Sequence, residues 1–148
     1  MAMVIGYSCV LNFCATESGS YDKIDLVKEA ALSMTIGEAD TTTRDSNRVK
    51  LYLPTLIDFE IGGSLIKNAA PLSNWHVLRG YALSGTVFFV QALDAVLSGN
   101  GMQGPVFISK WDDSEPIDDI ATTSFTLKPA YYATGTWQKV DGGSAGAW

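Results

Sequence analysis

The sequence contains few of the residue types from which most catalytic and metal sites are built. Among its 148 residues are one histidine and two cysteines. These residues, His76, Cys9 and Cys14, lie in unrelated segments, and their spacing matches no zinc site. The sequence also lacks a glycine-rich phosphate loop, a serine nucleophile elbow and a Cys–His pairing. We therefore expect a protein that is not an enzyme and that holds no metal and no cofactor.

Basic residues are also scarce. Ten Lys and Arg stand against 16 Asp and Glu, which gives a net charge of −6. Phosphate binding needs clustered Lys and Arg, whereas here the basic residues are scattered singly along the chain. The charge balance excludes a groove that grips nucleic acid. It is still compatible with a protein that handles DNA without binding it.

Long apolar runs are missing as well. None reaches the roughly 18 residues that a membrane span requires, so we expect no membrane association. Residues 1–15 are apolar, but the first basic residue is Lys23, so the positive region of a signal peptide is absent. The β-branched and aromatic residues in 4–13 predict a strand instead. In such a strand Cys9 and Cys14 point to opposite faces, and we expect two buried free thiols of a protein made in a reducing cytoplasm.

What the sequence does contain is apolar surface and strand patterns. Apolar residues make up 47% of the chain and charged residues 18%, against about 25% charged in an average soluble domain. A chain of this length is expected to form a single domain, 1–148. Surplus apolar surface on a small domain is expected to lie in a subunit interface.

Alternating patterns predict several strands. Residues 30–37 place one set of side chains on one face (Ala30, Leu32, Met34, Ile36) and a small, hydroxyl-bearing set on the other (Ala31, Ser33, Thr35, Gly37), which predicts a half-buried strand. After a turn at 45–47 the alternation resumes until Pro54 interrupts it. It continues over 57–61, and Gly62-Gly63 indicates a bulge or a bend.

One helix and three further strands follow. Ser73-Asn74 supplies capping residues, the apolar residues Trp75, Leu78 and Ala82 recur at helical spacing, and Ser84-Gly85 supplies a stop. Strands are predicted over 86–93, 106–111 and 122–127, with a glycine-containing loop over 98–104. The Gly/Ser-rich tail, 141–148, is expected to be flexible. The order of elements predicts a mainly β fold, a β-sandwich or partly closed barrel with one flanking α-helix.

Hydroxyl and acidic side chains share the outward positions of these strands. The set comprises Ser33, Thr35, Asp58, Glu60, Thr122, Ser124 and Thr126. Acidic groups repel phosphates, and short hydroxyls offer them no cation, so such a surface suits the wall of a channel that DNA slides through. The residues alone favour the simpler reading that these are ordinary solvent-facing positions of a sheet.

Two segments carry a resemblance to a known family. The first is Gly-Glu-Ala-Asp-Thr-Thr-Thr-Arg at 37–44, followed by Leu-Pro-Thr-Leu at 53–56. The second is Ser-Glu-Pro-Ile-Asp-Asp at 114–119, leading into 123–129. In this order they resemble the tail tube proteins of long-tailed bacteriophages and prophages. The resemblance extends over about 24–136, whereas the apolar strand at 4–13 departs from it.

The resemblance implies a structural subunit of the virion tail, made in the cytoplasm of a bacterial host. It implies hexameric rings whose inner sheets join into one continuous β-barrel, and a stack of rings that forms a hollow conduit for DNA during ejection. The outward hydroxyl and acidic set would then face the lumen. The extended loop 37–54 would make the contact between rings through its charged residues (Glu38, Asp40, Arg44, Asp45, Arg48, Lys50). Expected partners are further copies of the chain and the tail initiator, terminator and tape measure proteins.

Two other functions stay open at this point. One is the ring protein of a contractile injection or secretion system, which passes protein. The other is a monomeric carbohydrate-binding β-sandwich whose platform is aromatic (Trp111, Tyr131, Tyr132, Trp137, Trp148). The acidic stretch 112–119 lacks the order of a calcium loop, so we expect a turn or an interface loop there. His76 is expected at the surface or in packing.

Overall fold

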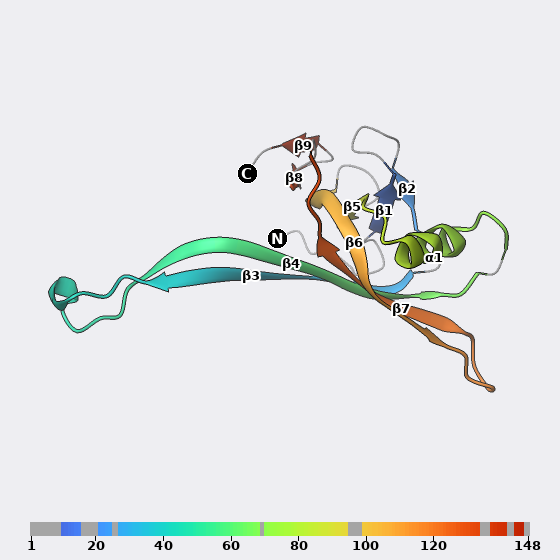
Figure 1. The fold of residues 1–148 in the computed structure, drawn as a ribbon, viewed down its shortest axis with the longest axis horizontal. Coiled ribbons are helices and arrows are strands. Elements are labelled where there is room, and N and C mark those ends of the chain that lie inside the picture. The colour runs from blue at the N-terminus through green and yellow to red at the C-terminus, as the bar shows by residue number, and fades with distance from the viewer. Residues whose placement is uncertain are drawn as a thin grey trace.

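The structure is a computed structural model that describes residues 10–15, 21–24, 27–68, 70–94, 99–133, 137–141 and 144–146. It is a mainly antiparallel β structure with one helix (Figure 1), as the sequence predicts. The elements are β1 (Val10–Cys14), β2 (Asp22–Lys23), β3 (Val27–Asp40), the 3-10 turn η2 (Arg44–Ser46), β4 (Tyr52–Ile66), α1 (Asn74–Ser84), β5 (Phe88–Leu93), β6 (Gly101–Ser114), β7 (Thr122–Pro129), β8 (Gln138–Asp141) and β9 (Ser144–Gly146).

All the described strands belong to one sheet. Its order is β2-β1-β5-β6-β7-β4-β3, with β8 on the first part of β6 and β9 on β8. Strand β6 is the centre of the arrangement, because its first half pairs with β5 and β8 and its second half pairs with β7. Every pairing is antiparallel. Strand β6 therefore links three parts of the sheet: β1 and β2 through β5, β3 and β4 through β7, and β9 through β8.

Helix α1 covers one face of this sheet and has the bounds that its capping residues predict. The Ser73 side chain accepts a hydrogen bond from the His76 amide, and Gly85 adopts a left-handed φ of 68° while its N–H donates to the Tyr81 carbonyl. Trp75 and Leu78 are the buried residues of the helix. Its apolar stripe therefore faces the sheet.

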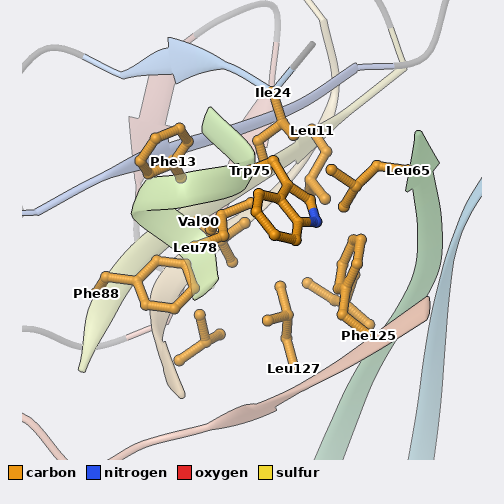
Figure 2. Packing of buried hydrophobic residues seen from close by; sticks show 12 residues of the cluster. Leu11, Phe13, Ile24, Leu65, Trp75, Leu78, Phe88, Val90, Phe125 and Leu127 are labelled. Atoms are coloured by element: carbon orange, nitrogen blue, oxygen red, sulfur yellow. The ribbon is translucent and has the colours of Figure 1, made fainter. Parts of the chain in front are cut away.

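The core lies between α1 and the sheet (Figure 2). Side chains from β1, β4, β5, β6 and β7 surround Trp75, among them Phe88 and Leu127. The indole Nε1–H of Trp75 donates to Thr123 Oγ1 at 2.9 Å, and the Thr123 hydroxyl donates to Asp113 Oδ1 at 2.7 Å. This chain of bonds satisfies the polar atoms that burial would otherwise leave unpaired.

A ladder of side-chain amides crosses four strands of the body. Asn12 of β1 donates to Gln91 of β5 at 3.2 Å, Gln91 donates to Gln103 of β6 at 2.8 Å, and Gln103 donates to Gln138 of β8 at 3.0 Å. The four residues are direct neighbours in strand register. Each side-chain amide is hydrogen-bonded to the next one in the ladder. The buried Gln103 accepts from Gln91 and donates to Gln138, so its amide has a partner in both neighbouring strands.

The predicted loop over 98–104 is wrong from Gly101 onward, because β6 begins there. The glycines mark close approaches instead of a turn. A Cβ on Gly101 would lie 1.8 Å from the Ala92 carbonyl oxygen, and one on Gly104 would lie 2.4 Å from the Trp137 ring. Each glycine thus lets a neighbour sit directly against the backbone of β6.

Of the predictions about β4, the interruption at Pro54 and the bulge at Gly62-Gly63 are also wrong. Pro54 does not interrupt the strand but lies opposite Glu38 in it. In this stretch β4 pairs with β3 alone, so the missing N–H can point to an open edge without breaking a ladder bond. Gly62-Gly63 is not a bulge, since the register there is unbroken on both sides. The register of this pair shifts instead at two other places, between Val27 and Glu29 and between Ile36 and Glu38, the second of them beside Gly37.

Some predicted segments fall outside the described residues. Of the strand expected at 4–13, the structure describes positions 10–13, which belong to β1. Cys9 lies outside the described residues, and Cys14 is a buried free thiol. In the tail expected at 141–148, Asp141 ends β8 and 144–146 form β9, while the other positions are outside.

Candidate assembly surfaces

Strands β3 and β4 form a long arm that projects from the body of the molecule (Figure 1). The apolar face of the arm is uncovered: Leu32, Met34 and Ile36 are 39%, 50% and 53% exposed. The prediction that this strand is half-buried is therefore wrong for the single chain. Its alternation is real, but no described element packs on the outer arm.

Burial begins at the root of the arm. Phe59 is 4% exposed and stacks on Trp137, with ring centroids 5.1 Å apart and an angle of 23° between the planes. Trp137 itself sits against Gly104 of β6. Trp137 thus connects the root of the arm to the centre of the sheet.

The polar face of the arm continues onto β7. In the strand register Ser33 lies opposite Glu60, and Thr35 lies opposite Asp58. Side chains opposite each other in register share a face, and the register carries this face through Gly62, Ser64 and Ile66 of β4 to β7. We call it the hydroxyl–acid face, and it brings together all the predicted outward residues: Ser33, Thr35, Asp58, Glu60, Thr122, Ser124 and Thr126.

This face lies on the side of the sheet away from α1. The intervening residues of β7, Thr123, Phe125 and Leu127, are buried in the core that contains Trp75. Five members of the hydroxyl–acid face are exposed, and Thr122 and Thr126 are half-buried. The sheet therefore has one face packed on the helix and one polar face toward solvent.

Sequence reasoning missed the part of this face that β6 supplies. Lys110, Asp112 and Ser114 lie opposite Thr126, Ser124 and Thr122 in register. Lys110 Nζ lies 3.3 Å from Asp112 Oδ2, so this cation is paired on the face itself. The signal that could have found them is the alternation of these residues with Trp111 and Asp113, which continues beyond the predicted end of the strand at Trp111.

The tip of the arm is closed by a small network. The Thr41 N–H donates to the Leu51 carbonyl at 2.9 Å, and the Leu51 N–H donates to Thr42 Oγ1 at 2.9 Å. Asp40 Oδ1 accepts from the Thr42 N–H at 2.8 Å. Hydrogen bonds from the side chain and then the backbone of Thr42 lower the pKa of the Asp40 carboxyl. The ionised Asp40 carboxylate therefore stabilises the turn by accepting hydrogen bonds from Thr42.

The predicted stacking residues spread over this tip. Glu38 and Asp40 are in β3, Arg44 and Asp45 are in η2, and Arg48 and Lys50 follow it, with Arg48 at a positive φ of 68°. All six side chains are exposed. Among the described residues, Arg44, Arg48 and Lys50 form no ion pair with the carboxylates that the sequence places around them.

The acidic stretch 112–119 is a hairpin end between β6 and β7. Four of its carboxylates have partners: Asp112 with Lys110, Asp113 with Thr123, Glu115 with Lys67, and Asp119, which accepts from the Ile120 N–H at 2.7 Å. No three potential metal ligands gather anywhere in the part of the chain that the structure describes. Residues 112–114 end β6, and the turn that the sequence predicts begins after them.

The aromatic residues proposed as a sugar platform contact different parts of the body. Trp137 stacks on Phe59. The ring centroids of Trp111 and Trp75 are 6.2 Å apart, and those of Tyr132 and Phe89, which meet edge-on, are 5.0 Å apart. Tyr131 is exposed, and Trp148 lies outside the described residues. His76 is exposed and contacts the Trp75 ring edge-on. Across the described residues, no helix has the length and apolar character needed to cross a bilayer.

Comparisons with known proteins show what this fold is similar to. No protein-family model matches the sequence, and none of the curated protein sequences matches it. Among solved structures, a chain from the tail of an empty gene transfer agent particle, determined with helical refinement and C6 symmetry, matches with a TM-score of 0.73 at 17% identity, covering 86% of this chain and 95% of that chain.

Two other assemblies match over similar lengths. The SPP1 tail tube gives a TM-score of 0.69 at 10% identity, covering 96% of this chain and 80% of that chain. The baseplate of the anti-feeding prophage gives 0.57 at 12% identity, covering 93% and 96%. The protein therefore has the fold of a tail tube subunit, and the fold implied by the resemblance in its sequence is confirmed.

Proposed function

We propose that this protein is the structural subunit of the tail tube of a phage or phage-like particle. Copies form hexameric rings, and the rings stack into a hollow conduit through which DNA passes during ejection. The observation that carries the proposal is the match, over 86% of the chain, to a tail determined with C6 symmetry. The subunit acts through its surfaces and is not an enzyme.

The open edges of the sheet support assembly into rings. Among the described strands, β3 pairs with β4 alone along its whole length of 14 residues, so its other edge is open. An exposed strand edge of this length pairs readily with another chain, and a closed barrel removes such edges. Joining the sheets of six subunits would close the edges and cover the apolar face of the arm together.

The hydroxyl–acid face suits the lining of the bore. Asp58 and Glu60 repel phosphate groups, and the neighbouring hydroxyls of Ser33 and Thr35 keep their hydration and give a phosphate no cation to bind. The Lys110 charge is neutralised locally by Asp112. A duplex would thus be held off the wall and could slide.

The arm supports stacking of one ring on the next. A head-to-tail contact between unlike surfaces repeats without closing and produces a filament. The charged residues at the end of β3 and in the turn that follows supply this contact: Glu38, Asp40, Arg44, Asp45, Arg48 and Lys50. In the particle the tube also binds the tail initiator, terminator and tape measure proteins, and the subunit is made in the cytoplasm of the bacterial host before it enters the virion tail.

A second candidate is a ring protein of a contractile injection system that passes protein cargo. The match to the anti-feeding prophage baseplate does not favour it over the DNA conduit, because its TM-score of 0.57 is lower than the 0.73 of the gene transfer agent tail. Packaging separates the two functions: purified particles with nuclease-protected DNA support the DNA conduit, whereas intact particles without DNA support the protein conduit.

The first test is negative-stain electron microscopy of the purified protein over a concentration series. Six-fold rings or hollow tubes are expected. Deleting 43–49 from the tip should leave rings and abolish tubes, while unchanged tubes would contradict the role of the arm. A monomer at every concentration, together with binding in a glycan screen, would overturn the proposal in favour of a carbohydrate-binding module.

The lining is tested separately through Glu60. Glu60→Lys places a cation on the hydroxyl–acid face and is expected to leave tube assembly intact while DNA delivery falls. Glu60→Gln, which removes the charge without reversing it, is the matched control and should deliver DNA at a rate near that of the wild type. Loss of folding in Glu60→Lys would contradict the placement of this residue toward the bore.

A further inference from the structure

Two hairpin ends project from opposite ends of the molecule (Figure 1). One is the arm tip, residues 41–51 between β3 and β4. The other, which we call the acidic tip, is residues 115–121 between β6 and β7. Each tip exposes two apolar side chains, Val49 and Leu51 on one and Ile117 and Ile120 on the other. The two tips differ in the charge that surrounds these side chains.

The acidic tip carries exposed isoleucines beside exposed carboxylates. Ile117 and Ile120 are 100% and 59% exposed, and they enclose Asp118 and Asp119. Among the described residues, no cation pairs with either aspartate. The tip therefore presents two apolar groups and two uncompensated negative charges.

The base of the acidic tip is held firmly by the body. Lys67 pairs with Glu115, and the Lys67 N–H donates to the Ala121 carbonyl at 3.0 Å. The Lys67 ammonium also lies 5.0 Å from the centre of the Trp75 ring. These contacts place the tip in a fixed position relative to α1, so that little ordering is needed when a partner binds.

The arm tip has the complementary composition. Val49 and Leu51 are 57% and 47% exposed, and Arg48 and Lys50 alternate with them. Within residues 41–51 the basic residues Arg44, Arg48 and Lys50 stand against the acidic residue Asp45, while Glu38 and Asp40 lie beside the tip in β3. None of the three is paired within the described residues. Apolar groups of one tip can therefore meet apolar groups of the other while their opposite charges lie alongside.

We propose that the arm tip of one subunit docks on the acidic tip of a second copy in the neighbouring ring. Arg48 and Lys50 bind Asp118 and Asp119, and Val49 and Leu51 pack against Ile117 and Ile120. This inference rests on the proposed function, and it names the surface that receives the arm. Because the two tips lie at opposite ends of one chain, their pairing joins copies head to tail. Charge pairing sets the register of the contact.

Charge reversal tests the pairing. Arg48→Glu with Lys50→Glu, or Asp118→Lys with Asp119→Lys, should leave rings intact and raise the protein concentration at which tubes form by on the order of tenfold or more, since like charges then face each other. All four changes together should restore tubes. The matched control reverses two exposed lysines of the body, Lys23→Glu with Lys128→Glu, and should leave stacking unchanged. Sedimentation and electron microscopy distinguish rings from tubes.

The outcomes separate the inference from the proposed function. Tubes that form normally in either reversed variant, or tubes that fail to return in the fourfold variant, overturn the docking while rings stand. A wild-type chain that forms neither rings nor tubes overturns the proposed function and the docking with it. If the lysine variants unfold by circular dichroism, Asp118→Asn with Asp119→Asn replaces them, and a salt dependence of stacking equal to that of the wild type then contradicts the docking.

Discussion

The body and the arm use the same strand pattern with opposite results. Ile61 at the root of β4 and Ile36 near the end of β3 lie on the same face of the sheet, yet they are 2% and 53% exposed. In the body α1 and the curved sheet cover that face, whereas along the arm the described chain supplies no cover. Alternation thus identifies which face is apolar, but the covering partner has to come from elsewhere in the fold or from another subunit.

The largest effect is expected in the middle of the body. Trp75→Ala removes the side chain around which the core packs and leaves Thr123 without its donor. Large-to-small changes of this kind cost about 3–5 kcal/mol of unfolding free energy, measurable by urea denaturation. Leu83→Ala, on the same helix but 76% exposed, should change stability by less than about 0.5 kcal/mol. An equal loss of stability in both variants would contradict the assignment of one helix face as buried and the other as exposed.

The same substitution in the two regions tests the comparison directly. Ile61→Thr buries a hydroxyl and removes a methyl group from the core, and should cost about 2–4 kcal/mol. Ile36→Thr on the exposed arm should cost less than about 0.5 kcal/mol in the monomer, and it should weaken ring assembly. Stability comes from denaturation of dilute protein, and assembly comes from sedimentation. A strongly destabilised Ile36→Thr monomer would show that the arm is covered in the free chain.

A smaller effect is expected where the body holds the root of the arm. Gly104→Val would place a Cβ 2.4 Å from the Trp137 ring and push the indole away from Phe59. Overpacking of this kind costs about 1–3 kcal/mol, and Trp137 fluorescence should report the displacement. Gly80→Ala is the control, because its Cβ would meet nothing within 4 Å and alanine favours a helix. An unchanged fluorescence spectrum in Gly104→Val would contradict the contact.

The smallest effect concerns the pH response of the arm tip. The pKa of Asp40 lies below the ordinary 3.8, so the ionised form is the one that the folded tip stabilises. Its contribution is complete above the ordinary pKa and is lost as the pH falls through the lowered value. An NMR titration should place the Asp40 midpoint below 3.8 in the wild type and closer to it in Thr42→Val. Thr41→Val, which keeps the backbone bond to Leu51, should leave the midpoint unchanged.

Features fixed by local chemistry could be predicted from the sequence. The bounds of α1 follow from Ser73 and Gly85, and the alternation of β3, β4 and β7 placed seven residues on outward positions that the structure gathers on one face. That these residues line a bore stays a proposal. The start of β6 was missed because Gly101 and Gly104 look like turn residues, whereas their role depends on Ala92 and Trp137, which are distant in sequence. Exposure of the arm was missed because alternation does not reveal what covers a face.

The amide ladder from Asn12 through Gln91 and Gln103 to Gln138 links four strands of the body by hydrogen bonds between uncharged groups. Ionic strength and mild acid act on ion pairs and leave amide hydrogen bonds nearly untouched. The proposed contacts between tips, in contrast, depend on exposed charges. Raised salt should therefore take a tube apart into rings whose strands keep their registry, so that dismantling the tail and unfolding the subunit become two separate events.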